Sequence, residues 1–130
     1  MPLVRLSMRK GKSREEIKAV SDAVHDALVA AFQIPVDDRN QRIIEYARDD
    51  YELPPDKTDM FTLIELTVFA GRSLATKKKL YVEINRRLEA LGFHNPKDIV
   101  IVMTEVPLDN WGVLGGVPAS SIRLPFSLDI

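Results

Sequence analysis

Residues 61–73 read FTLIELTVFAGRS, a run of β-branched and aromatic residues that ends in a Gly-Arg-Ser triplet. The run predicts a strand. The triplet predicts a turn into a helix that is capped by Ser73. Residues 1–13 read MPLVRLSMRKGKS and repeat this arrangement 60 positions earlier, with Ser13 in the place of Ser73. Two copies of a strand, turn and helix start therefore decide the architecture.

The offset of 60 positions continues through both halves of the chain. Apolar residues recur every three or four positions after Ser13 and after Ser73, which predicts two helices that each bury one face. A second strand is predicted after each helix, at 42–46 and at 98–105. The equivalent pairs include Val24 and Ile84, Leu28 and Leu88, Asp38 and Asp98, and Glu45 and Glu105.

These elements predict a duplicated β-α-β unit within a single domain, 1–130, of the α+β class. The pseudo-repeats span about 2–46 and 62–106, and a tail of turns and short extended pieces follows at 107–130. Right-handed crossovers place both helices on one face of a four-stranded sheet. The strand at 61–69 is apolar at nearly every position, which predicts burial on both faces. We therefore expect an oligomer that covers the other face.

Composition excludes several function classes. The chain has 130 residues, a net charge of −1 and no cysteine, so disulfides, thiolate metal sites and a cysteine nucleophile are excluded. The near-neutral charge argues against nucleic acid and anionic membranes as partners. His25 and His94 are isolated and make no case for a metal site. We expect a cytoplasmic protein that uses no metal and no cofactor.

Several short motifs, in this order, resemble the tautomerase superfamily. Pro2 leads directly into a strand, the Gly-Lys-Ser and Gly-Arg-Ser triplets follow their strands, and residues 111–120 read WGVLGGVPAS. This last stretch resembles the aromatic-Gly-x-Gly-Gly segment of oxalocrotonate tautomerase, with one extra residue. The chain length and residues 34–39, IPVDDR, look closer to malonate semialdehyde decarboxylase. The resemblance covers nearly the whole chain.

The resemblance implies a homotrimer and a catalytic Pro2 whose amine is freed by removal of Met1. A model α-amino group titrates at about 7.7–8.0, so a proline amine is suited to general acid–base work near neutral pH. The resemblance also implies that Arg72 binds a substrate carboxylate and that Asp38 acts with the proline. At position 70, where the decarboxylases carry another arginine, this chain has Ala70.

Three further residues are candidates for substrate binding. Trp111 would line the pocket as an apolar wall, Arg39 could add positive charge near its mouth, and Lys12 occupies the place of a substrate-binding arginine in oxalocrotonate tautomerase. The expected activity is keto-enol tautomerisation of a small 2-oxo or enol carboxylate. Decarboxylation of a 3-oxo acid, hydration of an unsaturated acid, and a non-enzymatic trimeric binding module remain alternatives.

Overall fold

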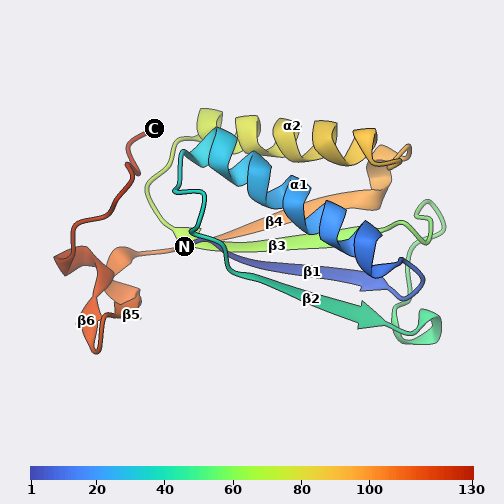
Figure 1. Ribbon diagram of the computed structural model, residues 1–130, viewed down its shortest axis with the longest axis horizontal. Coiled ribbons are helices and arrows are strands. Elements are labelled where there is room, and N and C mark those ends of the chain that lie inside the picture. Colours follow the sequence, from blue (N-terminus) through green and yellow to red (C-terminus); the bar gives the residue numbers. More distant parts are fainter.

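The structure is a computed structural model that describes residues 1–130 (Figure 1). Each half of the chain forms a strand, a helix and a second strand, and a small hairpin follows. The elements are β1 Leu3–Arg9, α1 Arg14–Phe32, β2 Gln41–Tyr46, β3 Thr62–Phe69, α2 Leu74–Ala90, β4 Ile99–Val106, β5 Gly112–Val113 and β6 Val117–Pro118. The predicted duplication is therefore confirmed, and strand bounds differ from the prediction by one residue.

The four long strands form one mixed sheet in the order β2-β1-β3-β4. β1 pairs with β2 in parallel and β3 with β4 in parallel, whereas β1 and β3 are antiparallel. Arg5 lies opposite Glu65 in the antiparallel pair, and these two residues are themselves equivalent in the repeat. The two halves are therefore related by a local pseudo-twofold axis near Arg5 and Glu65. Equivalent residues of the two halves consequently lie at opposite ends of the sheet.

Both helices begin at the predicted serines. Ser13 accepts from the backbone N–H of Glu16, and the Glu16 side chain accepts from Ser13 in a capping box. Ser73 accepts from the backbone N–H of Thr76, which carries no carboxylate to complete a box. The glycine before each triplet's basic residue adopts φ of +139° at Gly11 and +137° at Gly71, a conformation that favours glycine at each turn.

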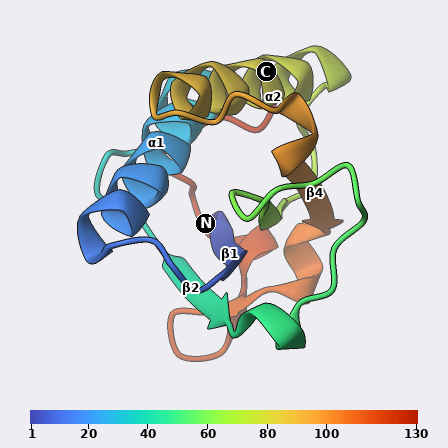
Figure 2. The same ribbon diagram turned by 90° about the vertical axis from the view of Figure 1, so that its right-hand side faces the viewer.

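The core lies between the helices and one face of the sheet, as Figure 1 and Figure 2 show. Alternate residues of β1 and β3 point into it, and the apolar faces of α1 and α2 cover them. The fully buried side chains of this layer include Val4, Leu6, Met8, Val24, Leu28, Ile64, Leu66, Ile84 and Leu88.

No helix covers the other face of the sheet (Figure 1). Leu63, Glu65 and Thr67 of β3 are half-buried in the single chain, so the chain itself leaves open the face for which an oligomer was predicted. At the edge, Val100 is 37% exposed and Val102 is 47% exposed. Arg5 Nε donates to Glu65 at 2.9 Å across the middle of this face. Neither helix is long and apolar enough to cross a lipid bilayer.

Candidate active site

The start of the chain lies at the end of the sheet where Asp38 is presented. β2 runs parallel to β1, so the turn that precedes β2 lies beside the residues that precede β1. Both carboxylate oxygens of Asp38 lie 2.7 Å from the Met1 amine. Pro2 is the next residue and is buried. The predicted pair of Pro2 and Asp38 is therefore brought together in space, with Met1 between them.

Arg72 reaches the same end of the sheet because β3 is antiparallel to β1. It follows β3, and its side chain is buried, with 5% of its surface exposed. The guanidinium carbon lies 4.1 Å from the centre of the Phe32 ring and 5.6 Å from that of Phe126, distances typical of cation–π contacts. Its Nη1 donates weakly, at 3.5 Å, to the carbonyl oxygen of Phe69.

The other edge of the Arg72 guanidinium has no acceptor in the chain. Nε and Nη2 are both buried and both without a hydrogen-bond partner. These two atoms form the fork with which arginine binds a carboxylate through two parallel hydrogen bonds. A buried N–H group without a partner costs free energy, so an acceptor from outside the chain would stabilise this edge.

Burial lowers the pKa of Arg72 to about 10, and the negative charges of Glu105 and Asp38 oppose this shift. The group therefore remains a cation at neutral pH. The attraction of Asp38 also indicates that the guanidinium and the carboxylate beside the chain terminus share one electrostatic environment. A cation and an anion are thus both available at the same end of the sheet.

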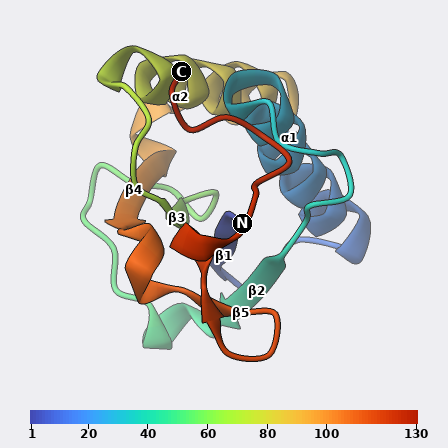
Figure 3. The ribbon, with the colours of Figure 1, turned by 90° about the vertical axis from the view of Figure 1, so that its left-hand side faces the viewer.

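An aromatic cluster lies beside Arg72, and the C-terminal segment runs from the small hairpin back to α2 (Figure 3). The Trp111 ring meets Phe69 edge-on at 4.8 Å, and Phe126 stacks on Phe69 at 6.2 Å. Trp111 Nε1 donates to the carbonyl oxygen of Val106 at 3.1 Å, which fixes the indole. The segment then passes Gly71 and ends at α2, where the Ser73 N–H donates to the Ile130 carbonyl oxygen at 3.0 Å. The predicted apolar wall at Trp111 lies next to residues that contact Arg72.

The sequence did not indicate Phe32 and Phe126 as residues of the candidate site. Phe32 is the last residue of α1, where an apolar residue is expected simply to join the core. Phe126 lies in a tail without helical or strand periodicity. Their contact with Arg72 depends on how α1 and the tail pack, so a pattern of neighbouring residues carries no signal for it.

Lys12 is not brought to this site within one chain. It follows β1, at the end of the sheet that is opposite to Pro2 and Arg72. There its Nζ lies 5.9 Å from the centre of the Phe93 ring, and burial lowers its pKa against the attraction of nearby carboxylates, Glu16 foremost. A cavity of about 300 Å³ adjoins it. The cation–π contact between Arg72 and Phe32 thus has a counterpart at the second end of the sheet, where Lys12 lies near Phe93.

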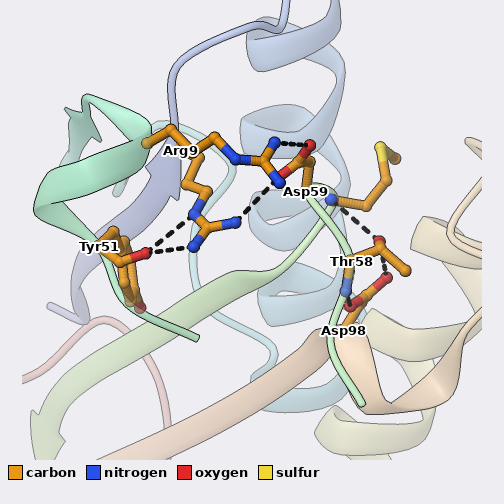
Figure 4. A network of polar contacts seen from close by, with 7 residues as sticks. Arg9, Tyr51, Thr58, Asp59 and Asp98 are labelled. Carbon is orange, nitrogen blue, oxygen red and sulfur yellow. Dashed lines mark hydrogen bonds and ion pairs between the residues drawn. The ribbon is translucent and has the colours of Figure 1, made fainter. Parts of the chain in front are cut away.

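At that second end the polar side chains are paired within the chain itself, as Figure 4 shows. Asp98, the equivalent of Asp38, is buried and accepts from the Thr58 N–H at 2.7 Å and from its hydroxyl at 2.5 Å. Arg9 donates to the Tyr51 carbonyl oxygen and to Asp59. The position equivalent to Pro2 is Thr62, inside the continuous chain, so no amine is available there.

Arg39 is bound to α1 and not to Arg72 or its surroundings. Its Nη2 lies 2.6 Å from an oxygen of Asp22 and 3.0 Å from the Ser21 hydroxyl. Although Arg39 follows Asp38 directly, its charge is neutralised on the helix. The structure therefore brings Pro2, Asp38, Arg72 and Trp111 together at one end of the sheet and leaves Lys12 and Arg39 apart from them.

Comparisons with known proteins identify the family of this chain. Two family models, both described as "Tautomerase enzyme", match residues 38–113 and 2–56. The "Probable tautomerase YusQ" of Bacillus subtilis (strain 168) is 25% identical over 89% of this chain and 95% of its own length. FG41 malonate semialdehyde decarboxylase inhibited by 3-bromopropiolate has a TM-score of 0.81 and 28% identity, over 95% of this chain and 99% of that one.

The fold is also that of a fused 4-OT solved as a symmetric trimer, which has a TM-score of 0.78 at 24% identity over 92% of this chain and 97% of that one. A duplicated β-α-β domain of this kind is the fold of tautomerase-like proteins. The chain belongs to the tautomerase family, and the resemblance noted from the sequence is confirmed.

Proposed function

We propose that this protein is an enzyme that interconverts the keto and enol forms of a small 2-oxo carboxylate. Pro2, freed by removal of Met1, moves the proton, and Arg72 binds the carboxylate. The observation that carries the proposal is the buried Nε–Nη2 edge of Arg72, which has no acceptor in the chain. A carboxylate of the substrate would satisfy both N–H groups at once.

The proton transfer uses groups at the same end of the sheet. The neutral Pro2 amine accepts the proton of the enol hydroxyl, which leaves an enolate. The resulting ammonium then donates its proton to the carbon next to C2, as the electron pair of the C=C bond forms the new C–H bond and an oxygen pair forms the C2 carbonyl. Asp38, 2.7 Å from the present terminal amine, would stabilise the ammonium between these two steps. The Arg72 cation would stabilise the enolate that forms transiently.

A decarboxylase or hydratase is the second candidate, supported by the 28% identity to FG41 malonate semialdehyde decarboxylase. In such a reaction a protonated Pro2 would polarise a carbonyl while the carboxylate of a 3-oxo acid is released as CO2. Ala70 weakens this candidate, because its position offers no second guanidinium. Its backbone N–H donates to the Val106 carbonyl oxygen at 3.0 Å, and its methyl group has no polar function.

The enzyme is expected to ketonise phenylenolpyruvate or a 2-hydroxy-alkenoate faster than buffer does, measured by ultraviolet absorbance. Protein with a free Pro2, confirmed by intact mass, should be used, with malonate semialdehyde and CO2 release assayed in parallel. Ketonisation without release of CO2 would support the proposed tautomerase activity. Release of CO2 without ketonisation would replace it with the decarboxylase, and no rate on either substrate would favour the binding module.

We also propose that the protein is a homotrimer that buries the uncovered face of the sheet. The trimeric fused 4-OT of the same fold supports an oligomer, and the exposed Val100 and Val102 supply apolar surface for it. The sheet would then be covered by helices on one side and by other subunits on the other, as two-sided burial of a sheet requires.

The Val102→Glu substitution is expected to break this assembly, because it places a charge in an apolar interface. Sedimentation should show the mass fall from three times the chain's 14.7 kDa to a single chain. Val82→Glu is the matched control, since Val82 is 66% exposed on the outer side of α2. A Val102→Glu variant with the mass of the unmodified protein would contradict the assignment of this face.

A further inference from the structure

His25 is buried in α1, with 3% of its surface exposed. Its Nε2 lies 2.6 Å from the carbonyl oxygen of Val36. Because a carbonyl oxygen can only accept, Nε2 must carry the proton and donate it. This hydrogen bond connects the core side of α1 to the turn before β2, which is the turn that presents Asp38.

The turn at 34–39 has little apolar packing of its own beyond Ile34, which is 4% exposed. The Val36 side chain is 73% exposed, so its packing does little to hold the turn in place. Within the turn, the Asp38 N–H donates to the Pro35 carbonyl oxygen at 3.0 Å. Polar contacts to α1 therefore decide where the turn sits.

Two such contacts flank Asp38. His25 binds Val36 on one side, two residues before Asp38. On the other side Arg39 binds Asp22 at 2.6 Å, one residue after Asp38. The two anchor residues, Asp22 and His25, are three positions apart and therefore lie on one face of α1. Asp38 is held between these clamps with both oxygens directed at the terminal amine.

The second half of the chain offers a contrast. Asn85 of α2 is the repeat equivalent of His25, but its Nδ2 donates to Tyr81 of the same helix at 2.8 Å. Asp98, the equivalent of Asp38, is instead held by Thr58. A hydrogen bond between a helix side chain and the aspartate turn thus occurs only in the half that presents its aspartate to the amine.

We propose that His25 is a positioning residue of the active site, which holds the 34–39 turn so that the Asp38 carboxylate meets the Pro2 amine. This inference rests on the proposed function, because it assigns His25 a role in the same reaction. His25 touches neither the amine nor the substrate and acts through Val36 and the turn.

Two substitutions of similar chemistry separate the hydrogen bond from general packing. In His25→Gln the side-chain amide nitrogen can occupy the place of Nε2 and donate to Val36. In His25→Asn the shorter side chain cannot reach it. We expect kcat/KM for ketonisation to stay within about threefold in His25→Gln and to fall by about 10- to 100-fold in His25→Asn, the range in which misplacement of a catalytic group acts. Asn85→Leu is the control on the other helix and should leave kcat/KM unchanged.

A double substitution and a pH profile distinguish positioning from stability. In a protein that already carries Asp38→Asn, adding His25→Asn should not lower kcat/KM for ketonisation any further. The limb of the kcat/KM profile that titrates the Pro2 amine should move toward lower pH in His25→Asn, as in Asp38→Asn, because the ammonium loses its anion. Equal rates in His25→Asn and His25→Gln would overturn the inference, as would additive losses with Asp38→Asn. If Pro2 and Asp38 substitutions leave the rate unchanged, the proposed function itself fails.

Discussion

Replacing Pro2 with alanine is expected to lower kcat/KM for enol ketonisation by about 10²-fold or more, within the 10²–10⁴-fold that general acid–base groups contribute. The proline ring restricts the directions that the nitrogen lone pair can take beside Asp38. Alanine leaves a primary amine that rotates freely and loses this orientation. The measurement is initial rate by ultraviolet absorbance, on protein whose loss of Met1 is confirmed by intact mass.

A form that retains Met1 provides the complementary test. Its Pro2 nitrogen is an amide without a basic lone pair, so it should be at least as inactive as Pro2→Ala. Pro54→Ala is the matched control, because Pro54 is exposed in the connection between β2 and β3. Wild-type rates in Pro2→Ala, or in protein that retains Met1, would show that another group moves the proton.

Replacing Arg72 with methionine is expected to change activity and stability in opposite directions. Loss of two charge-assisted hydrogen bonds to a carboxylate removes about 3–4 kcal/mol of binding, which corresponds to about 10²–10³-fold in kcat/KM. The same change relieves a buried cation of which two N–H groups lack partners. Methionine packs well against aromatic rings, so the contacts with Phe32 and Phe126 are largely kept.

We therefore expect the free energy of unfolding to rise by about 1 kcal/mol in Arg72→Met, after the loss of the cation–π contact with Phe32 is subtracted. Urea denaturation measures this change. Arg72→Lys is the conservative control, since it keeps the charge but not the fork, and should fall between the two proteins in activity. A structural arginine predicts the reverse result, with lowered stability and retained activity in Arg72→Met.

The secondary structure was predictable because its signals are local. Ser13 and Ser73 cap helices through bonds to residues three positions away, and each apolar helical face arises from spacings of three or four. The offset of 60 positions then required the two halves to be alike. The strand at 61–69 was expected to be buried on both faces with an oligomer covering one of them, and the chain alone does leave that face open.

Part of the candidate site could also be predicted from the sequence. Pro2, Arg72 and Asp38 were identified from short motifs that resemble a known family, and the structure places them at one end of the sheet. Asp38 meets the chain terminus because β2 is parallel to β1, and Arg72 arrives there because β3 is antiparallel to it. The triplets by themselves did not distinguish Lys12 from Arg72, since each follows a strand and opens a helix.

The sequence by itself thus determined the repeat, its strands and its helix starts, and it indicated the groups that we propose to carry the chemistry. Only the tertiary structure decided which basic residue joins the terminus, that Arg39 is neutralised by Asp22, that Phe32 and Phe126 enclose Arg72, and that His25 reaches the Asp38 turn. The physical reason is that caps and periodicities depend on residues a few positions apart. Burial and pairing of a charge depend instead on which strand ends and helix faces meet in space.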